Sequence, residues 1–132
     1  MYNCAVLLDG CRVSYESTCD LASAFRHLSK QPVFTGLYVE EGVSKSAFSI
    51  RYSESKEVSV QYHRQHAKIH APWSELREGE ALLYAALPFI EVQYQRMGYV
   101  TSHAAAVAFP QGAVMLLGPG GDGKTITALT LC

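Results

Sequence analysis

Hydrophobic and polar residues alternate in several short segments of the first half of the chain. The clearest segment is EVSVQYH, in which Val58, Val60 and Tyr62 alternate with polar residues. This pattern predicts a strand with one buried face and one solvated face. Similar runs rich in Val, Ile, Tyr and Phe cover residues 11–17, 36–42, 47–53 and 67–72. Because the links between the later runs are too short for parallel crossovers, we expect an antiparallel meander.

A helical period first appears in the segment TCDLASAFRHLSK. Its apolar residues Leu21, Phe25 and Leu28 fall on one face of a helix. Ser17 or Thr18 is the expected N-cap, because a hydroxyl at that position can accept a hydrogen bond from a free backbone N–H group. The pattern predicts an amphipathic helix of about three turns.

A second helical period runs over residues 74–97. Ser74 is its expected N-cap and Gly98 its expected C-terminal cap. Pro88 lies inside the segment and lacks a backbone N–H group, so we expect it to kink or split the helix. Trp73 is expected to anchor the start of the helix.

The pattern changes again after Gly98. An apolar strand at 99–109, a Pro-Gln-Gly turn and a second apolar strand at 113–117 precede a glycine-rich loop and a helix. Nearly continuous apolar runs are typical of strands covered on both faces. We therefore predict an α+β chain with two parts: a strand-rich, antiparallel N-terminal region with helices (1–97) and the start of a nucleotide-binding core (98–132).

Composition narrows the possible functions. The 132 residues are 48% hydrophobic and 17% charged, with a formal net charge of −1, which is typical of a globular chain and provides no basic footprint for nucleic acid. No apolar run approaches the roughly 18 residues that span a bilayer, and no basic segment precedes the first apolar run. The four cysteines match no zinc spacing. We expect a cytoplasmic protein with reduced thiols that binds neither nucleic acid nor membrane.

The glycine-rich loop carries the strongest chemical signal. Its eight residues match the pattern G-x-x-x-x-G-K-[ST] in full: Gly118, Pro119, Gly120, Gly121, Asp122, Gly123, Lys124 and Thr125. Glycines let backbone N–H groups approach phosphate oxygens, and the N-terminus of the following helix adds further donors. Lys124 is expected to reach the β- and γ-phosphates of ATP, and the Thr125 hydroxyl to bind Mg²⁺.

Two residues make this loop unusual. Asp122 places a negative charge beside the expected phosphates, so we expect its side chain to point outward into solvent. Pro119 fixes φ at the strand exit and stiffens the entrance to the loop.

The segment GYVTSHAAAVAFPQGAVMLLGPGGDGKTITALTL resembles the HPr kinase/phosphorylase-related kinases of the phosphoenolpyruvate-carboxykinase-like group. In that family a strand opening with His-Ala or His-Gly leads through a tight turn into a second strand and then the phosphate loop. Here His103 opens the first strand, fifteen residues before Gly118. The chain departs from the family in having Gly121 where a serine is usual.

The resemblance implies a kinase that transfers a phosphoryl group from ATP, with Mg²⁺, to a hydroxyl of a protein, a peptide or a small molecule. It also implies that His103 lies near the active site and that the catalytic acids lie downstream of the loop helix. The other interpretation of His103 is a side chain that caps a strand end. We expect this chain to be the N-terminal portion of such a kinase and to be inactive alone.

A non-catalytic module is the alternative. In that case the N-terminal region binds a peptide or protein, for example at an exposed sheet edge, and the loop senses phosphate or nucleotide. Under either hypothesis the apolar strands around the loop need partners, so we also expect self-association.

Three histidines, His63, His66 and His70, are spaced as H-x₂-H-x₃-H. On a single strand the first two would point to opposite faces, and Arg64 and Lys68 intervene. A solvated edge strand is therefore favoured over a metal site.

Overall fold

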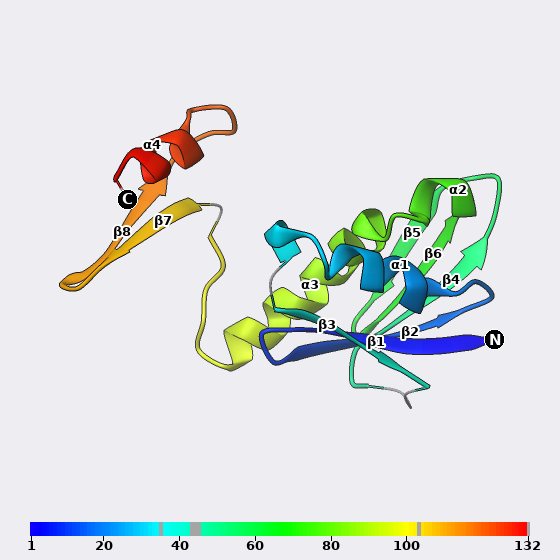
Figure 1. Ribbon diagram of the computed structural model, residues 1–132. Coiled ribbons are helices and arrows are strands. Elements are labelled where there is room, and N and C mark those ends of the chain that lie inside the picture. The colour runs from blue at the N-terminus through cyan, green and yellow to red at the C-terminus, as the bar shows by residue number, and fades with distance from the viewer. Residues whose placement is uncertain (35, 43–45, 103, 132) are drawn as a thin grey trace. The chain divides into compact units, whose positions relative to one another are not determined.

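Figure 1 shows the chain as a computed structural model, which describes residues 1–34, 36–42, 46–102 and 104–131. The chain divides into two compact units, Met1–Tyr99 and Val100–Cys132, which are described separately below. Within the described residues, no helix has the length and apolar character needed to cross a membrane.

The first unit is a six-stranded mixed sheet with helices. Its strands are β1 (Tyr2–Leu8), β2 (Cys11–Ser17), β3 (Leu37–Glu41), β4 (Ser49–Glu54), β5 (Ser59–His63) and β6 (His66–Ala71). Its helices are α1 (Leu21–Leu28), the short 3₁₀ turn Pro32–Phe34, α2 (Trp73–Leu76) and α3 (Glu80–Arg96). The strand order across the sheet is β3-β1-β2-β4-β6-β5.

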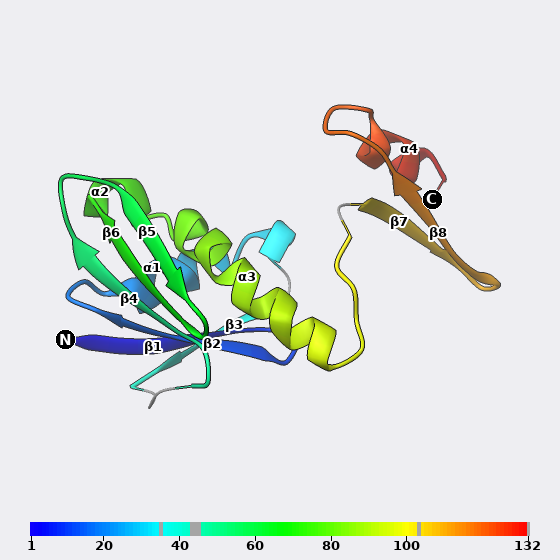
Figure 2. The ribbon, with the colours of Figure 1, turned by 180° about the vertical axis from the view of Figure 1, so that it is seen from behind.

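The expected antiparallel meander is wrong. β2 pairs with β4 in parallel, and β4 pairs with β6 in parallel. β5 does not lie next to β4, because β6 folds back from β5 and inserts between the two strands. The short links allow this arrangement. After β4 the chain skips the neighbouring strand position to form β5, and it returns through a tight hairpin so that β6 fills the skipped position. The two views in Figures 1 and 2 show β4, β6 and β5 side by side in that order.

The β1–β2 hairpin follows from its turn residues. Asp9 and Gly10 both have positive φ, at 48° and 85°, which suits the right-handed twist of the paired strands. β1 itself is an additional strand that the pattern did not assign, because the run Cys4–Leu8 is apolar throughout and lacks alternation.

The core lies on one face of the sheet. Alternate residues of β1, β2, β4 and β6 point toward α1 and α3, and they include the fully buried Val6, Tyr15 and Ile50. Tyr15 packs against Phe25 of α1, with ring centroids 4.8 Å apart. Most side chains on the opposite face are polar, among them Glu16, Arg51 and Lys68, and the described helices α1, α2 and α3 contribute to the core.

The first helix was placed correctly but its start was not. α1 spans eight residues, about two turns, and its N-cap is Asp20, whose carboxylate accepts a hydrogen bond from the Ser23 N–H group at 3.2 Å. Ser17, one of the expected caps, is buried and accepts a hydrogen bond from the Cys19 N–H group instead.

The predicted helix at 74–97 is split, but not at Pro88. The break covers residues 77–79: α2 ends at Leu76, and Gly79, with a φ of 81°, is the N-cap of α3. Pro88 lies within α3 on its exposed side. The carbonyl of Tyr84, which Pro88 leaves without a helical donor, belongs to an exposed residue and can be hydrated.

Both ends of this helical segment are well defined. Pro72, not Ser74, precedes α2 as its N-cap, and Trp73 packs near Tyr52 with ring centroids 6.0 Å apart. At the other end Gly98 has a φ of 84° and donates to the Gln95 carbonyl. The adjacent Tyr99 N–H group donates to the Tyr94 carbonyl, which completes a Schellman cap as predicted for Gly98.

β5 has no fully buried face, although alternation predicted one. It is an edge strand, and Val60 and Tyr62 are 45% and 48% exposed. Tyr62 still contacts the core edge: its ring lies 5.7 Å from that of Phe89, and its hydroxyl donates to the Ala85 carbonyl.

Candidate functional site

The second unit has the element order that the sequence predicts around the glycine loop. β7 (Ala104–Phe109) and β8 (Gly112–Leu117) form an antiparallel hairpin, paired from Ala104–Leu117 to Phe109–Gly112. The loop 118–123 follows β8 and leads directly into α4 (Lys124–Leu131), as Figure 1 shows. The loop is therefore fixed between a strand end and a helix start.

The backbone of the loop depends on its glycines. Gly121 and Gly123 have φ values of 88° and 73°, in the left-handed region that side chains disfavour. Beyond Gly123 the chain becomes helical, and the Thr127 N–H group donates to the Gly123 carbonyl at 2.9 Å. The N–H groups of the first turn of α4 precede the regular hydrogen-bond ladder and are available to an anion at the loop.

Lys124 closes the loop on itself. Its Nζ donates to the carbonyl oxygens of Gly118, at 2.9 Å, and Pro119, at 2.7 Å. The ammonium group therefore lies across the loop entrance, next to the end of β8. A lysine held at this point by two neutral acceptors can transfer its hydrogen bonds to phosphate oxygens, because both partners are then charged and the contact is stronger than one to a neutral carbonyl.

Asp122 does not simply point away from the loop. The residue is exposed, as expected, but its carboxylate folds back toward Gly118. A Cβ added to Gly118 would lie only 3.1 Å from Oδ2 of Asp122. The loop thus brings one positive and one negative side chain to the same residue, Gly118.

Of the two remaining candidate residues, Thr125 and His103, the structure describes only Thr125. Thr125 is exposed in the first turn of α4, on the helix end that faces the loop. His103 lies outside the described residues. Gly118–Thr125 are thus brought together as one local feature, and the role of His103 stays a prediction.

The strands beside the loop are not covered on both faces, contrary to the expectation from their apolar runs. Val107 and Ala128 are the residues of this unit that the described part of the chain buries. Met115 and Leu117 of β8 are 56% and 68% exposed, and Leu129 of α4 is 71% exposed. A hairpin and one short helix offer too little surface to cover these side chains.

The histidine triplet lies in the first unit and spans two strands. His63 ends β5, His66 begins β6, and the two are direct cross-strand partners on the same face. The assumption of a single strand was therefore wrong. His66 Nδ1 lies 2.7 Å from the Ser49 hydroxyl. Across the described ranges, no three His, Cys, Asp or Glu side chains are grouped as metal ligands would be.

The polar face of the sheet contains residues that the sequence alone did not single out. Arg51 of β4 and Lys68 of β6 are adjacent in the register, on the same face as His63 and His66. Arg51 and Lys68 each alternate with buried residues along their strands, and this alternation, visible in the sequence, indicates that they lie on the exposed face. Their proximity was hidden because it depends on the parallel pairing of β4 with β6.

No known protein family, curated protein or solved structure matches the chain.

Proposed function

We propose that this chain is the ATP-binding portion of an HPr-kinase-like P-loop kinase. In this proposal the loop 118–123 holds the phosphates of ATP, Lys124 contacts the β- and γ-phosphates, and Thr125 binds Mg²⁺. The acceptor is a hydroxyl of a protein, a peptide or a small molecule. The observation that carries the proposal is Lys124, whose ammonium group lies across a glycine loop between a strand and a helix N-terminus.

The residues present fit a nucleotide's phosphates. Two glycines adopt left-handed backbone conformations in the loop, and the first turn of α4 supplies free N–H donors. Nucleotide with Mg²⁺ would supply the transferable phosphoryl group. The chain's own contribution is to bind and orient the phosphates through backbone donors and to neutralise charge through Lys124.

Catalysis needs more than this loop. Asp122 is the single acidic residue between Val100 and Cys132, and its place in the loop suits neither a catalytic base nor a second metal ligand. We therefore expect this chain to bind nucleotide without turning it over. His103, by the family resemblance, would support the active site.

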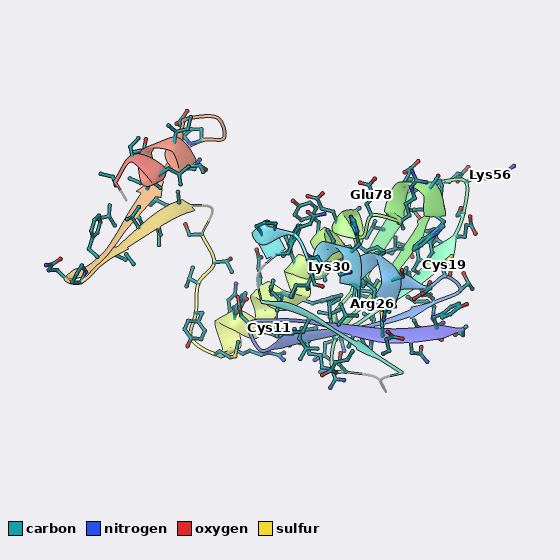
Figure 3. The ribbon with its side chains drawn as sticks, in the orientation of Figure 1. Cys11, Cys19, Arg26, Lys30, Lys56 and Glu78 are labelled. Atoms are coloured by element: carbon teal, nitrogen blue, oxygen red, sulfur yellow. The ribbon has the colours of Figure 1, made fainter. Side chains whose placement is uncertain are left out.

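Titration calorimetry with ATP and Mg²⁺ tests the proposal. We expect binding to the unaltered chain and a loss of at least about tenfold in affinity for Lys124→Ala, because a charged phosphate contact is removed. Lys30→Ala is the matched control: Lys30 is an exposed lysine just beyond α1, labelled in Figure 3. Equal affinity of the Lys124→Ala chain and the unaltered chain would refute a phosphate-binding loop.

A non-catalytic peptide- or protein-binding module with a phosphate-sensing loop is the second candidate. The observation that favours it is the first unit, in which the described helices pack on the core face of the sheet and β5 is an exposed edge strand. The calorimetric result distinguishes the candidates only in part, because both bind phosphate. Phosphoryl transfer by a version of the protein extended beyond Cys132 would favour the kinase.

A further inference from the structure

The polar face of the six-stranded sheet contains a hollow of about 750 Å³. Side chains from all strands except β3 line it, among them Asn3, Glu16, Ser49, Arg51, His63 and Lys68. Its volume is within the range of ligand sites, roughly 300–1,000 Å³.

Two rows of side chains cross the strands in this hollow. The register aligns Glu16, Arg51, Lys68 and Gln61 in one row, on β2, β4, β6 and β5. The neighbouring row contains Ser14, Ser49, His66 and His63 on the same strands. The β4, β6 and β5 part of the hollow therefore collects an arginine, a lysine and two histidines.

The acidic residues of this face are already paired. Glu16 accepts two hydrogen bonds from Arg51, at 2.8 and 3.1 Å, through the same carboxylate oxygen. Glu40 on β3 pairs with Arg12 at 2.8 Å. By contrast, the Nζ of Lys68 has no hydrogen bond or ion pair within the described ranges, although the side chain is exposed and flanked by Arg51.

The polar contacts also leave donors available. His66 uses Nδ1 in its 2.7 Å contact with Ser49, which leaves Nε2 for a ligand. Arg51 engages Glu16 through Nε and Nη2, which leaves Nη1 free among the contacts of the described residues. With histidine counted as neutral, Arg51, Lys68 and Glu16 give this hollow one formal positive charge, whereas the chain as a whole has a formal net charge of −1.

We propose that this hollow binds an extended acidic peptide, with its carboxylates on Lys68, Arg51 and the two histidines. Carboxylates on alternate residues of an extended chain are roughly 7 Å apart. The diagonal pair Lys68–His63, on the antiparallel strands β6 and β5, has a similar separation, about 7–8 Å. The basic groups are distributed over three strands, which suits a ligand with several separated carboxylates better than a single small anion.

Fluorescence anisotropy with a labelled, end-blocked hexaglutamate peptide tests this site on the full chain without nucleotide. We expect saturable binding that weakens with salt, and a loss of about tenfold in affinity for Lys68→Glu, since like charge then faces the peptide. His63→Gln should weaken binding more modestly. Thermal melting of each variant shows whether the exposed substitution leaves the fold intact.

Lys56→Glu is the matched control, because it makes the same change of charge at an exposed residue. Lys56 lies in the turn between β4 and β5 and extends away from the sheet in Figure 3. An equal loss of peptide affinity for Lys56→Glu and Lys68→Glu would show that the effect depends on the overall charge of the protein and not on this hollow, and it would overturn the proposed site.

Three further outcomes would also overturn it. The first is an absence of peptide binding. The second is competition by free glutarate or inorganic phosphate as effective as by unlabelled peptide, which would indicate a small-anion site. The third is binding that survives Lys68→Glu but is lost in Val60→Pro, which would indicate strand addition at the β5 edge. Failure of ATP binding at Lys124 would leave this proposal unaffected, because it concerns the first unit alone.

Discussion

The hydroxyl of Tyr15 donates a 2.7 Å hydrogen bond to the backbone carbonyl of Leu82, and this contact ties the centre of β2 to α3. Both residues are almost completely buried, and they are 67 positions apart in the chain. The contact therefore links the sheet to the helix that covers it.

Removing this hydroxyl should destabilise the first unit. We expect Tyr15→Phe to lower the free energy of unfolding by about 1 kcal/mol, because a buried hydrogen bond is lost while the ring still packs. For a unit of this size that corresponds to a melting temperature lower by about 4–8 °C, measured by circular dichroism. Tyr84→Phe on α3 is the control, since its hydroxyl bonds Glu80 at the surface. An equal effect of the two substitutions would contradict the role of Tyr15.

Buried tyrosines should also limit stability at high pH. Burial raises the pKa of Tyr52 from 10.0 to about 12, and it raises the pKa of Tyr15 well above 10.0. Below pH 10 both are protonated whether folded or unfolded, so their contribution is fully present. Above pH 10 the unfolded chain releases these protons first, and stability falls toward pH 12.

Urea unfolding at a series of pH values measures this loss. We expect Tyr52→Phe to reduce the slope of stability against pH between 10 and 12, because one titrating group is removed. Tyr38→Phe, an exposed tyrosine on β3, is the comparison. An unchanged slope in the Tyr52→Phe chain would show that this hydroxyl is not protected from ionisation.

Gly79 is required both for its backbone conformation and for the space beside it. An added Cβ would lie 3.0 Å from the Ala24 carbonyl oxygen and 3.1 Å from Leu28 Cδ1, at a φ of 81°. Gly98 has nearly the same φ, 84°, with no atom within 4 Å of an added Cβ. We expect Gly98→Ala to cost about 1–2 kcal/mol and Gly79→Ala distinctly more, measured by urea unfolding. Equal losses of stability in the two variants would mean that α1 moves away from an added Cβ at residue 79 at no cost in free energy.

Asp122 should weaken phosphate binding at the proposed loop. Its carboxylate faces Gly118 from within the loop, so Asp122→Asn removes a repulsion and should raise the affinity for ATP about fivefold, equivalent to about 1 kcal/mol. Calorimetry measures the change. Glu78→Gln, at an exposed site of the first unit, is the control. A lower affinity in the Asp122→Asn chain would show that the carboxylate supports binding instead, for example through a metal ion.

Exposed apolar residues of the second unit should promote self-association. Leu117 and Leu129 are 68% and 71% exposed. We expect sedimentation velocity to show a concentration-dependent increase in mass that the double substitution Leu117→Gln and Leu129→Gln reduces. A monomer at all concentrations would contradict this expectation.

Local features of the fold could be read from the sequence, and non-local pairing could not. The Asp9-Gly10 turn, the Gly98 cap and the loop between β8 and α4 each depend on residues close together in the chain. The parallel partners of β4 are distant in sequence, and the same alternation suits either neighbour. The lack of space for a side chain at Gly79 comes from contact with α1, which no local pattern reveals.

The two candidate sites differ in the same way, because one is contiguous in the sequence and the other depends on non-local strand pairing. The glycine loop is a contiguous motif, so sequence located it to the residue. The basic hollow is assembled from β4, β5 and β6, and its members became neighbours only through the strand order.

The central position of β4 has a consequence for how the protein folds. The β1–β2 and β5–β6 hairpins each close through a two-residue turn and can form locally within microseconds. β4 has no such local partner: its pairing with β2 joins residues 35 positions apart, as in Ser14–Ser49. The sheet is completed only when both hairpins dock on opposite sides of this one strand. Formation of β4 should therefore be the slow, committing step, and a destabilised β4 would leave the β3-β1-β2 strands and the β5–β6 hairpin as separate parts with exposed edges.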